Sequence, residues 1–203
     1  MRYILTLILL FAATTTLAVP ANYTLQADRS EVGFIYTLSG AAIRGSMPVR
    51  SAQILIDIDQ FSNSSVDVTL DVSRAKAGLV FATEALKSES VLSVSTHPSI
   101  QFKSTAVRLN NPRNLSQGGK IDGLLTIRNV TKPVTLDTAL FLQPGSAEGD
   151  FSRLSFRISG AVNRSDFGAS GYGDLVNDII NIDIAARVVR AVIVNQPLNT
   201  QHP

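Results

Sequence analysis

The chain has 203 residues, with 18 Lys and Arg against 16 Asp and Glu, and no cysteine. This near-neutral balance without a basic run excludes the electrostatic footprint that nucleic-acid binding requires. The lack of cysteine excludes thiolate catalysis, thiolate metal sites and disulfides, so the stability of the fold has to come from an apolar core.

Residues 1–18, MRYILTLILLFAATTTLA, have the pattern of a secretory signal peptide. A single charge at Arg2 precedes an apolar run over residues 3–13, and small residues lead to a predicted cleavage site after Ala18. A membrane anchor is the weaker interpretation, because the apolar run is shorter than the about 20 residues that span a bilayer. We therefore expect a periplasmic or secreted protein with no transmembrane segment in its mature form.

From residue 22 onward, apolar and polar residues alternate with the period of two that is typical of half-buried β-strands. The clearest example is VDVTLDV at residues 66–72. The predicted strands are, in chain order, 32–38, 54–58, 66–72, 100–104, 123–127, 134–142, 154–160 and 180–186.

Residues 75–92 follow a different pattern, in which Leu79, Ala82 and Leu86 recur with helical spacing. This spacing predicts one or two short helices that cap a barrel or a sandwich. No other connection is long and helical enough to return a parallel strand, so we expect antiparallel pairing. Residues 19–190 are expected to form a single all-β domain, and residues 191–203 a flexible C-terminal tail.

Few side chains in the sequence are suited to catalysis. One histidine, His97, lies before a proline in a loop-like context, and the other lies in the predicted tail. The acid pairs Asp57 with Asp59 and Asp67 with Asp71 have the period of a solvated strand face, which we favour over a glycosidase dyad. An enzyme would need an inward-facing acid with a shifted pKa, and the pattern nominates none. We therefore predict no catalytic residue, no metal site and no cofactor.

Three separated segments stand out: THPSIQFKST at 96–105, GLLTIRNVTKPVTL at 123–136 and ISGAVNRSDFGAS at 158–170. They resemble, in the same order, motifs of the YceI-like family of bacterial polyisoprenoid-binding, lipocalin-like proteins. With the segment DRSEVGFIYT, the resemblance extends from about Tyr23 to Val188. The chain departs from the family pattern at four places. Arg29 stands where His is usual, and Asn129 stands where Gly precedes Val-Thr-Lys-Pro. RGSM at 44–47 replaces the common Gly-x-Phe, and SVLSV at 90–94 lacks the Phe-Phe/Leu-Asp of the family.

The resemblance implies an extended antiparallel, lipocalin-like β-barrel of about eight strands with one or two short helices. It also implies a long-chain isoprenoid or another long-chain lipid inside the barrel, export from the cytoplasm and, often, a homodimer. Within the second motif, Asn129 is expected to take the left-handed turn position that the family fills with Gly. Pro133 is expected to start the next strand.

The inward-facing residues define the candidate ligand site. Small side chains beside aromatic ones would leave a tube-like gap, whereas the same aromatic side chains would otherwise fill the core. The predicted cavity lining consists of Phe34, Tyr36, Phe102, Leu125, Ile127, Leu136, Phe156, Ile158 and Phe167. A diphosphate or carboxylate head group is expected near the barrel mouth, at Arg44, Lys132 and Arg164.

These features favour an exported protein that binds an apolar lipid for transport or sequestration. The main alternative is a stress-response or interaction protein with a filled core and no ligand, because a fold does not dictate a function. An outer-membrane barrel is disfavoured, because such barrels carry aromatic girdles and this chain has no Trp and four Tyr.

Overall fold

The computed structural model describes residues 20–111 and 117–192. The predicted signal peptide, and the predicted tail beyond Val192, lie outside the described residues. The strands are β1 (Ala21–Leu25), β2 (Glu31–Leu38), β3 (Ala41–Ser46), β4 (Val49–Ile56), β5 (Ser65–Asp71), β6 (Ser99–Leu109), β7 (Gly119–Ile127), β8 (Val130–Leu142), β9 (Arg153–Asn163) and β10 (Ile179–Arg190). The helices are α1 (Val80–Lys87) and the 3-10 helices η1 (Ala27–Arg29), η2 (Phe61–Asn63), η3 (Val72–Arg74) and η5 (Arg164–Phe167). Within the described ranges, no helix combines the length and the apolar character that crossing a bilayer requires.

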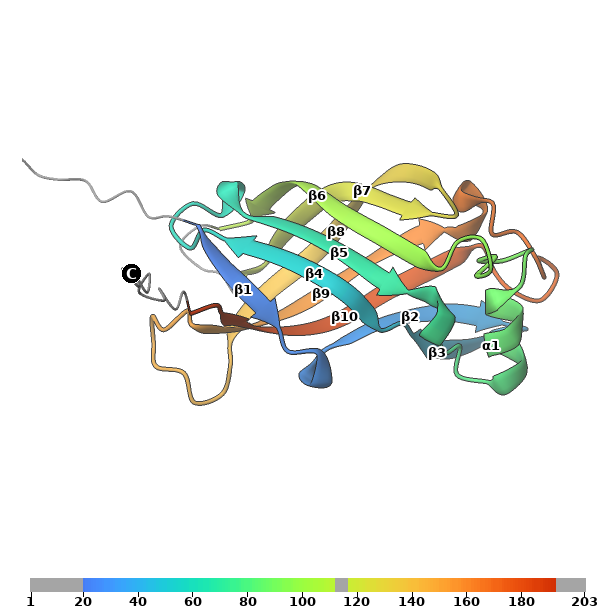
Figure 1. Cartoon of the computed structure of the whole chain (residues 1–203), viewed down its shortest axis with the longest axis horizontal. Coiled ribbons are helices and arrows are strands. Elements are labelled where there is room, and N and C mark those ends of the chain that lie inside the picture. The colour runs from blue at the N-terminus through green and yellow to red at the C-terminus, as the bar shows by residue number, and fades with distance from the viewer. Residues whose placement is uncertain (1–19, 112–116, 193–203) are drawn as a thin grey trace, which may run out of the picture.

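Eight strands form a closed antiparallel barrel (Figure 1). Their order around the barrel is β1, β4, β5, β6, β7, β8, β9 and β10, and β1 closes the ring by pairing with β10, where Leu25 lies opposite Val188. The remaining strands, β2 and β3, form a hairpin. This hairpin extends the wall, because β2 pairs with β10 at a different height from β1, with Phe34 opposite Ile182. The predicted lipocalin-like barrel with a short helix in residues 75–92 is confirmed.

The motif GLLTIRNVTKP forms a hairpin corner between β7 and β8. Arg128 and Asn129 make the two-residue turn, with φ angles of 51° and 61°. Positive φ at both positions matches the twist of the flanking strands, and asparagine tolerates this conformation, so the prediction for Asn129 is confirmed. The prediction for Pro133 is wrong, because β8 already begins at Val130. Pro133 is accommodated because β8 pairs with β9 only from Asp137 onward, which leaves one side of the proline without a ladder partner.

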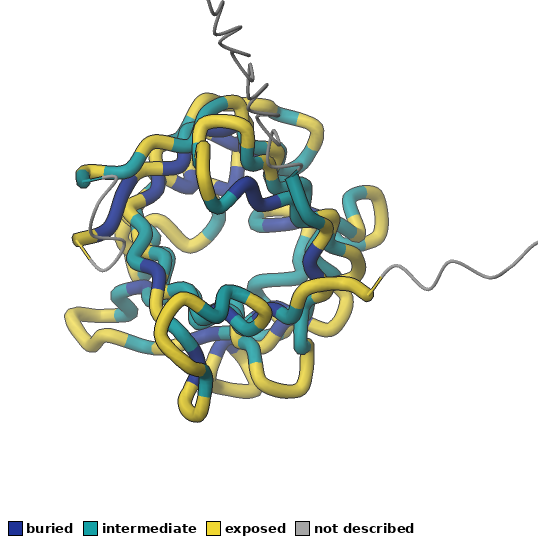
Figure 2. The backbone as a smooth tube through the Cα atoms, turned by 90° about the vertical axis from the view of Figure 1, so that its left-hand side faces the viewer, coloured by how far each residue is buried: buried dark blue, intermediate teal, exposed yellow. Residues whose placement is uncertain are grey.

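Apolar clusters lie at the two ends of the barrel. Val72 and Phe167 are deeply buried in the cluster at the end that carries α1, and Leu154 and Val188 in the cluster at the opposite end. Figure 2 looks along the long axis and shows the chain as a ring around that axis. The alternation in the sequence therefore turns apolar side chains into one shared interior, and polar ones toward the outside.

Candidate functional site

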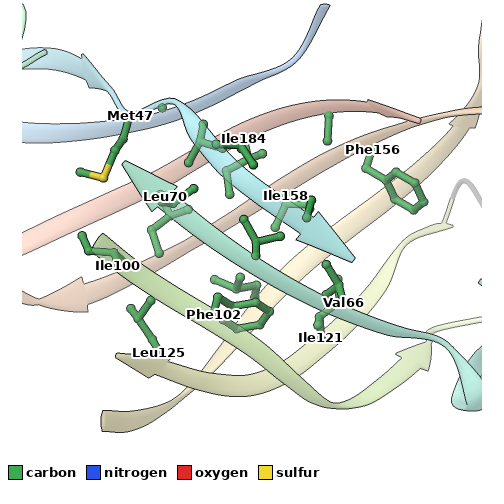
Figure 3. A pocket seen from close by; sticks show the side chains of 18 of the residues that line it. Met47, Val66, Leu70, Ile100, Phe102, Ile121, Leu125, Phe156, Ile158 and Ile184 are labelled. Carbon is green, nitrogen blue, oxygen red and sulfur yellow. The ribbon is translucent and has the colours of Figure 1, made fainter. Parts of the chain in front are cut away.

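A cavity of about 790 Å³ lies inside the barrel, bordered by both end clusters. Every strand of the closed barrel contributes inward-facing side chains to its wall, and so does β2. Figure 3 labels ten of the lining residues: Met47, Val66, Leu70, Ile100, Phe102, Ile121, Leu125, Phe156, Ile158 and Ile184. The volume lies within the range of about 300–1,000 Å³ that is common for small-molecule sites, and the wall is overwhelmingly apolar.

Two inward-facing glycines help to keep this lumen open. A Cβ atom at Gly123 would lie 2.5 Å from the ring of Phe102, and one at Gly160 would lie 2.6 Å from Cδ2 of Leu136. Phe102 and Leu136 therefore pack over bare backbone, close to the wall, and leave the centre of the lumen free. The free volume argues against the alternative of a filled core.

The structure places eight of the nine predicted residues in the cavity wall: Phe34, Phe102, Leu125, Ile127, Leu136, Phe156, Ile158 and Phe167. The prediction for Tyr36 is wrong. Its ring is buried in a separate cluster with Ala77 and Ala82, and its hydroxyl donates a hydrogen bond of 2.7 Å to the carbonyl oxygen of Ala77. The segment that contains α1 covers this part of the β2–β3 hairpin, so Tyr36 faces the helix and not the lumen.

Two of the three predicted head-group residues lie outside the cavity wall. Arg44 points to the outside of β3, where it forms ion pairs with Glu31 and Asp183. Lys132 is exposed on β8 and borders a separate, smaller pocket. Phe167 borders both pockets and packs between them. The structure therefore places Arg44 and Lys132 outside the cavity wall, and their contact with a head group stays a prediction.

The third residue, Arg164, does border the cavity and is buried. Its guanidinium donates hydrogen bonds to four backbone carbonyl oxygens, those of Ala169 (2.5 Å), Gly171 (2.7 Å), Val176 (3.0 Å) and Asn177 (3.2 Å). These bonds compensate the loss of water around the buried charge and fix the loop between η5 and β10. A guanidinium has five N–H donors, so one donor, on Nη2, is not used by these four carbonyl groups.

Thr138 supplies a second polar group in the wall, and the sequence reasoning did not select it. Its Oγ1 atom is buried and has no hydrogen-bond partner among the described residues. The signal was present in the sequence, since Thr138 is the one polar residue at an inward position of the alternating run 134–142. An unpaired buried hydroxyl is unfavourable unless a bound molecule or water supplies a partner.

Some residues that line the cavity are exposed, so the cavity reaches the surface. Four of them, Ala27, Glu31, Arg74 and Lys76, border an interruption of the barrel wall that is here called the side opening. Two chain interruptions produce it. η1 separates β1 from β2, and residues 47 and 48 separate β3 from β4. Because β1 pairs with β4 only at residues 54–56, the start of β4 has no β-ladder partner on that side.

Charges at the side opening are organised by Asp71. Its carboxylate lies 3.1 Å from Nε of Arg74 and 3.4 Å from Nη2 of Arg50. Hydrogen bonding from Ser73, followed by the interactions with Arg74 and Arg50, lowers the pKa of Asp71 to about 2. Lys76 forms no ion pair within the part of the chain that the structure describes, so this lip of the opening carries a net positive charge.

The predicted solvated face at Asp57 and Asp59 is wrong for Asp57, which is buried. Its carboxylate accepts hydrogen bonds from the side chain of Asn63 and from the backbone N–H groups of Gln60 and Asp59, which together lower its pKa. Asp57 therefore organises the loop around η2. Within residues 20–111 and 117–192, no group of three or more His, Cys, Asp or Glu side chains is placed to hold a metal ion.

A closed antiparallel barrel around an apolar lumen defines the class of lipocalin-like β-barrels. The sequence profile of the YceI-like domain matches residues 23–188. The chain therefore belongs to the YceI-like family, in agreement with the three sequence motifs.

Curated relatives are moderately similar to this chain. A UPF0312 protein of Serratia proteamaculans is 29% identical over 130 residues, which cover 64% of this chain and 65% of that protein. The protein YceI of Salmonella newport is 30% identical over 159 residues, which cover 76% of this chain and 79% of that protein. The match covers 65% of the length of the Serratia relative and 52% of the length of each of two Pectobacterium relatives. The chain thus spans about half to two thirds of the length of these curated relatives.

Two solved structures share the fold at low sequence identity. BcnA of Burkholderia cenocepacia superposes with a TM-score of 0.69 at 19% identity, covering 81% of this chain and 99% of that chain. A polyisoprenoid binding domain from Saccharophagus degradans, described as implicated in plant cell wall breakdown, superposes with a TM-score of 0.58 at 11% identity, covering 84% of this chain and 99% of that domain.

Proposed function

We propose that this protein is exported and holds a long-chain isoprenoid or a similar apolar lipid inside its barrel, as a carrier or to sequester the lipid. The observation that carries the proposal is the apolar cavity of about 790 Å³ inside the barrel. The fold shared with a solved polyisoprenoid binding domain supports the choice of ligand class.

The cavity volume suits a chain of moderate length. A water molecule takes about 30 Å³ of liquid volume, and a methylene group is of similar size, so the cavity holds roughly 26 such groups. Ligands of this size gain about 0.3 kcal/mol per heavy atom, which corresponds to about 8 kcal/mol and a Kd of about 1 µM. A longer lipid would extend through the side opening.

The polar groups of the wall suggest how such a lipid is oriented. Thr138 lies opposite Ile158 on β9, and Arg164 follows directly after the end of this strand at Asn163. Five residues of strand therefore separate the two groups, which is roughly 17 Å along the direction of β9. The wall between them is mainly apolar. A carboxylate, phosphate or hydroxyl oxygen at one end of the lipid would accept the remaining N–H donor of Arg164, while the apolar chain would run toward Thr138.

A binding function is favoured over catalysis by the placement of the acidic side chains. Among the described residues, Glu31 is the one carboxylate that borders the cavity, and it lies at the side opening in an ion pair with Arg44. General acid or base catalysis inside the lumen would need a carboxylate or histidine within reach of the substrate.

The test uses the absence of tryptophan from the sequence. Ala186→Trp places a single indole in the lumen, opposite Phe156, whereas Ala161→Trp places one on the outer face of β9. We expect a polyprenol to change the tryptophan fluorescence of A186W and not of A161W, with a Kd in the micromolar range. Native mass spectrometry of unmodified protein from a bacterial host is expected to show an extractable apolar lipid, and it also reports whether a homodimer forms. An empty protein together with an unresponsive A186W would refute the proposal.

A further inference from the structure

The side opening is continuous in the chain with an exposed apolar segment, residues 79–81. Lys76 borders the cavity, and the chain then runs through Leu79, Val80 and Phe81 into α1. The side chain of Val80 is 85% exposed and that of Phe81 is 65% exposed. These values are high for large apolar side chains, and adjacent ones of this kind mark an interaction site more often than isolated ones do.

The packing of α1 explains why these side chains point outward. The helix buries Ala82 and packs Leu86 against the cluster that contains Tyr36. Residues on that helical face hold the element on the barrel, so the first turn, with Val80 and Phe81, is left on the outside. The anchoring of α1 therefore does not depend on Val80 or Phe81.

Positive charge accompanies this apolar segment. On the same lip of the side opening, Arg50 and Arg74 share the single carboxylate of Asp71, and Lys76 has no ion-pair partner among the described residues. Glu84, one turn beyond Val80, is the nearest exposed acid on α1. The lip formed by residues 74–81 carries three exposed apolar side chains, and the cations at and beside it, Arg50, Arg74 and Lys76, exceed the carboxylate of Asp71 by two charges.

We infer that the lip formed by residues 74–81 docks onto an anionic bilayer surface and thereby brings the side opening to the membrane. Apolar side chains at the tip of such a lip enter the interfacial region, while Lys and Arg beside them contact anionic head groups. This inference rests on the proposed function, which makes the molecule that passes through the opening a lipid. A lipid carrier has to collect or deliver its lipid at a membrane.

The size of the lip favours a bilayer over a protein partner or a second copy of this chain. A stable protein interface buries at least about 1,000 Å² with close shape complementarity, whereas this lip offers three apolar side chains on one turn of chain. A bilayer surface needs no complementary shape and gains from each inserted side chain separately. Charge and exposure together therefore point to a lipid surface.

The experiment measures sedimentation of the full-length protein with vesicles of phosphatidylglycerol and, in parallel, of phosphatidylcholine. The test variant carries two substitutions, Val80→Asp and Phe81→Asp. The control variant carries Val192→Asp and Phe141→Asp. Val192 is also 85% exposed, and Phe141 is an exposed phenylalanine near the other end of the barrel. We expect the unmodified protein to bind the anionic vesicles. The affinity for these vesicles should fall by about tenfold or more in the test variant and should be unchanged in the control variant. Lys76→Glu is expected to weaken binding to anionic vesicles at low salt.

The outcomes separate the docking inference from the proposed function. Absence of binding to phosphatidylglycerol vesicles, or an equal loss in both double variants, overturns the inference. The inference is also overturned if the unmodified protein does not bind vesicles but forms an oligomer that the V80D and F81D variant does not form. That result would assign the lip to contact with a second copy of this chain. Uptake of a polyprenol from detergent is measured on the same proteins, and we expect it to be retained in V80D and F81D. Failure of this uptake in the unmodified protein would refute the proposed function, whatever the vesicles show.

Discussion

The ring of Phe102 on β6 packs over Gly123 on β7 so closely that a Cβ atom at Gly123 would lie 2.5 Å from the ring. Phe102 lines the cavity, and Gly123 lies on the same face of β7 as the lining residues Ile121 and Leu125. The glycine therefore sets how far the phenylalanine side chain projects into the cavity. The same relationship recurs where Leu136 packs over Gly160.

Replacement of Gly123 by alanine is expected to push Phe102 into the lumen. The overlap requires a shift of the ring, so we expect the free energy of unfolding to fall by about 1–3 kcal/mol and the affinity for a polyprenol to fall with it. Urea unfolding and ligand titration measure the two effects. Gly173→Ala is the matched control, because a Cβ atom there would make only an ordinary contact of 3.7 Å. Equal behaviour of the two variants would contradict the role of Gly123.

Replacement of Arg164 by methionine is expected to destabilise the loop between η5 and β10. Four carbonyl oxygens lose their donor at once, and we expect the free energy of unfolding to fall by about 3 kcal/mol. Arg164→Lys keeps the charge but not the planar fork, so its loss should be intermediate. Arg157→Met removes an exposed arginine from the outer face of β9 and serves as the control. A loss below that of R157M would show that the carbonyl contacts contribute little.

The strands and most of the cavity wall follow from a local rule. In the alternating runs, the position of a residue in its strand decides whether it faces the lumen, and this rule places residues such as Leu136 and Ile158 in the wall, where the structure has them. The rule also marks Thr138 as an inward polar residue, although sequence alone does not reveal that its hydroxyl lacks a partner.

The remaining features depend on contacts between distant segments. Phe34 and Tyr36 share one face of β2, yet only Phe34 reaches the cavity, because residues 77–82 cover Tyr36. Arg164 lies in a 3-10 helix, where strand alternation gives no direction for a side chain. The side opening arises from interruptions in two separate strand pairs, and their alignment in space is not encoded in any single stretch of sequence.

The carboxylate of Asp71 is expected to make stability depend on pH in the acid range. Its folded-state pKa is about 2, below the value of about 4 for an unfolded aspartate, so the unfolded state binds the proton more tightly. The stabilisation is complete above pH 4 and is lost as the pH falls through about 2. Melting temperatures between pH 7 and pH 2 measure it, and Asp71→Asn should lack this component. Asp28→Asn, which changes an exposed aspartate, is the control. If the melting temperature of D71N depends on pH in the same way as that of the unmodified protein, Asp71 is not the source of this pH dependence.

Replacement of Thr138 by valine tests the unpaired hydroxyl in the wall. Valine has nearly the same shape, so the variant removes a buried Oγ1 atom that has no protein partner among the described residues. We expect the ligand-free protein to gain about 1 kcal/mol of stability, because an unsatisfied polar group no longer has to be buried. The exposed Thr24 on β1 supplies the control variant, Thr24→Val, which should leave stability nearly unchanged.

The same variant distinguishes ligands by their polar groups. In the proposed orientation the polar end of the lipid lies at Arg164 and the apolar chain reaches Thr138, so we expect T138V to change the affinities for a polyprenol and for a hydrocarbon of equal length to the same extent. A several-fold weaker binding of the polyprenol alone would place its hydroxyl at Thr138 and would reverse the proposed orientation. Competition of the two lipids for the lumen, followed by the fluorescence of the lumenal tryptophan in A186W, gives this ratio directly. An equal change for both lipids would mean that Thr138 acts only through the shape of the wall. That outcome is the one expected for a lipid whose polar end lies at Arg164.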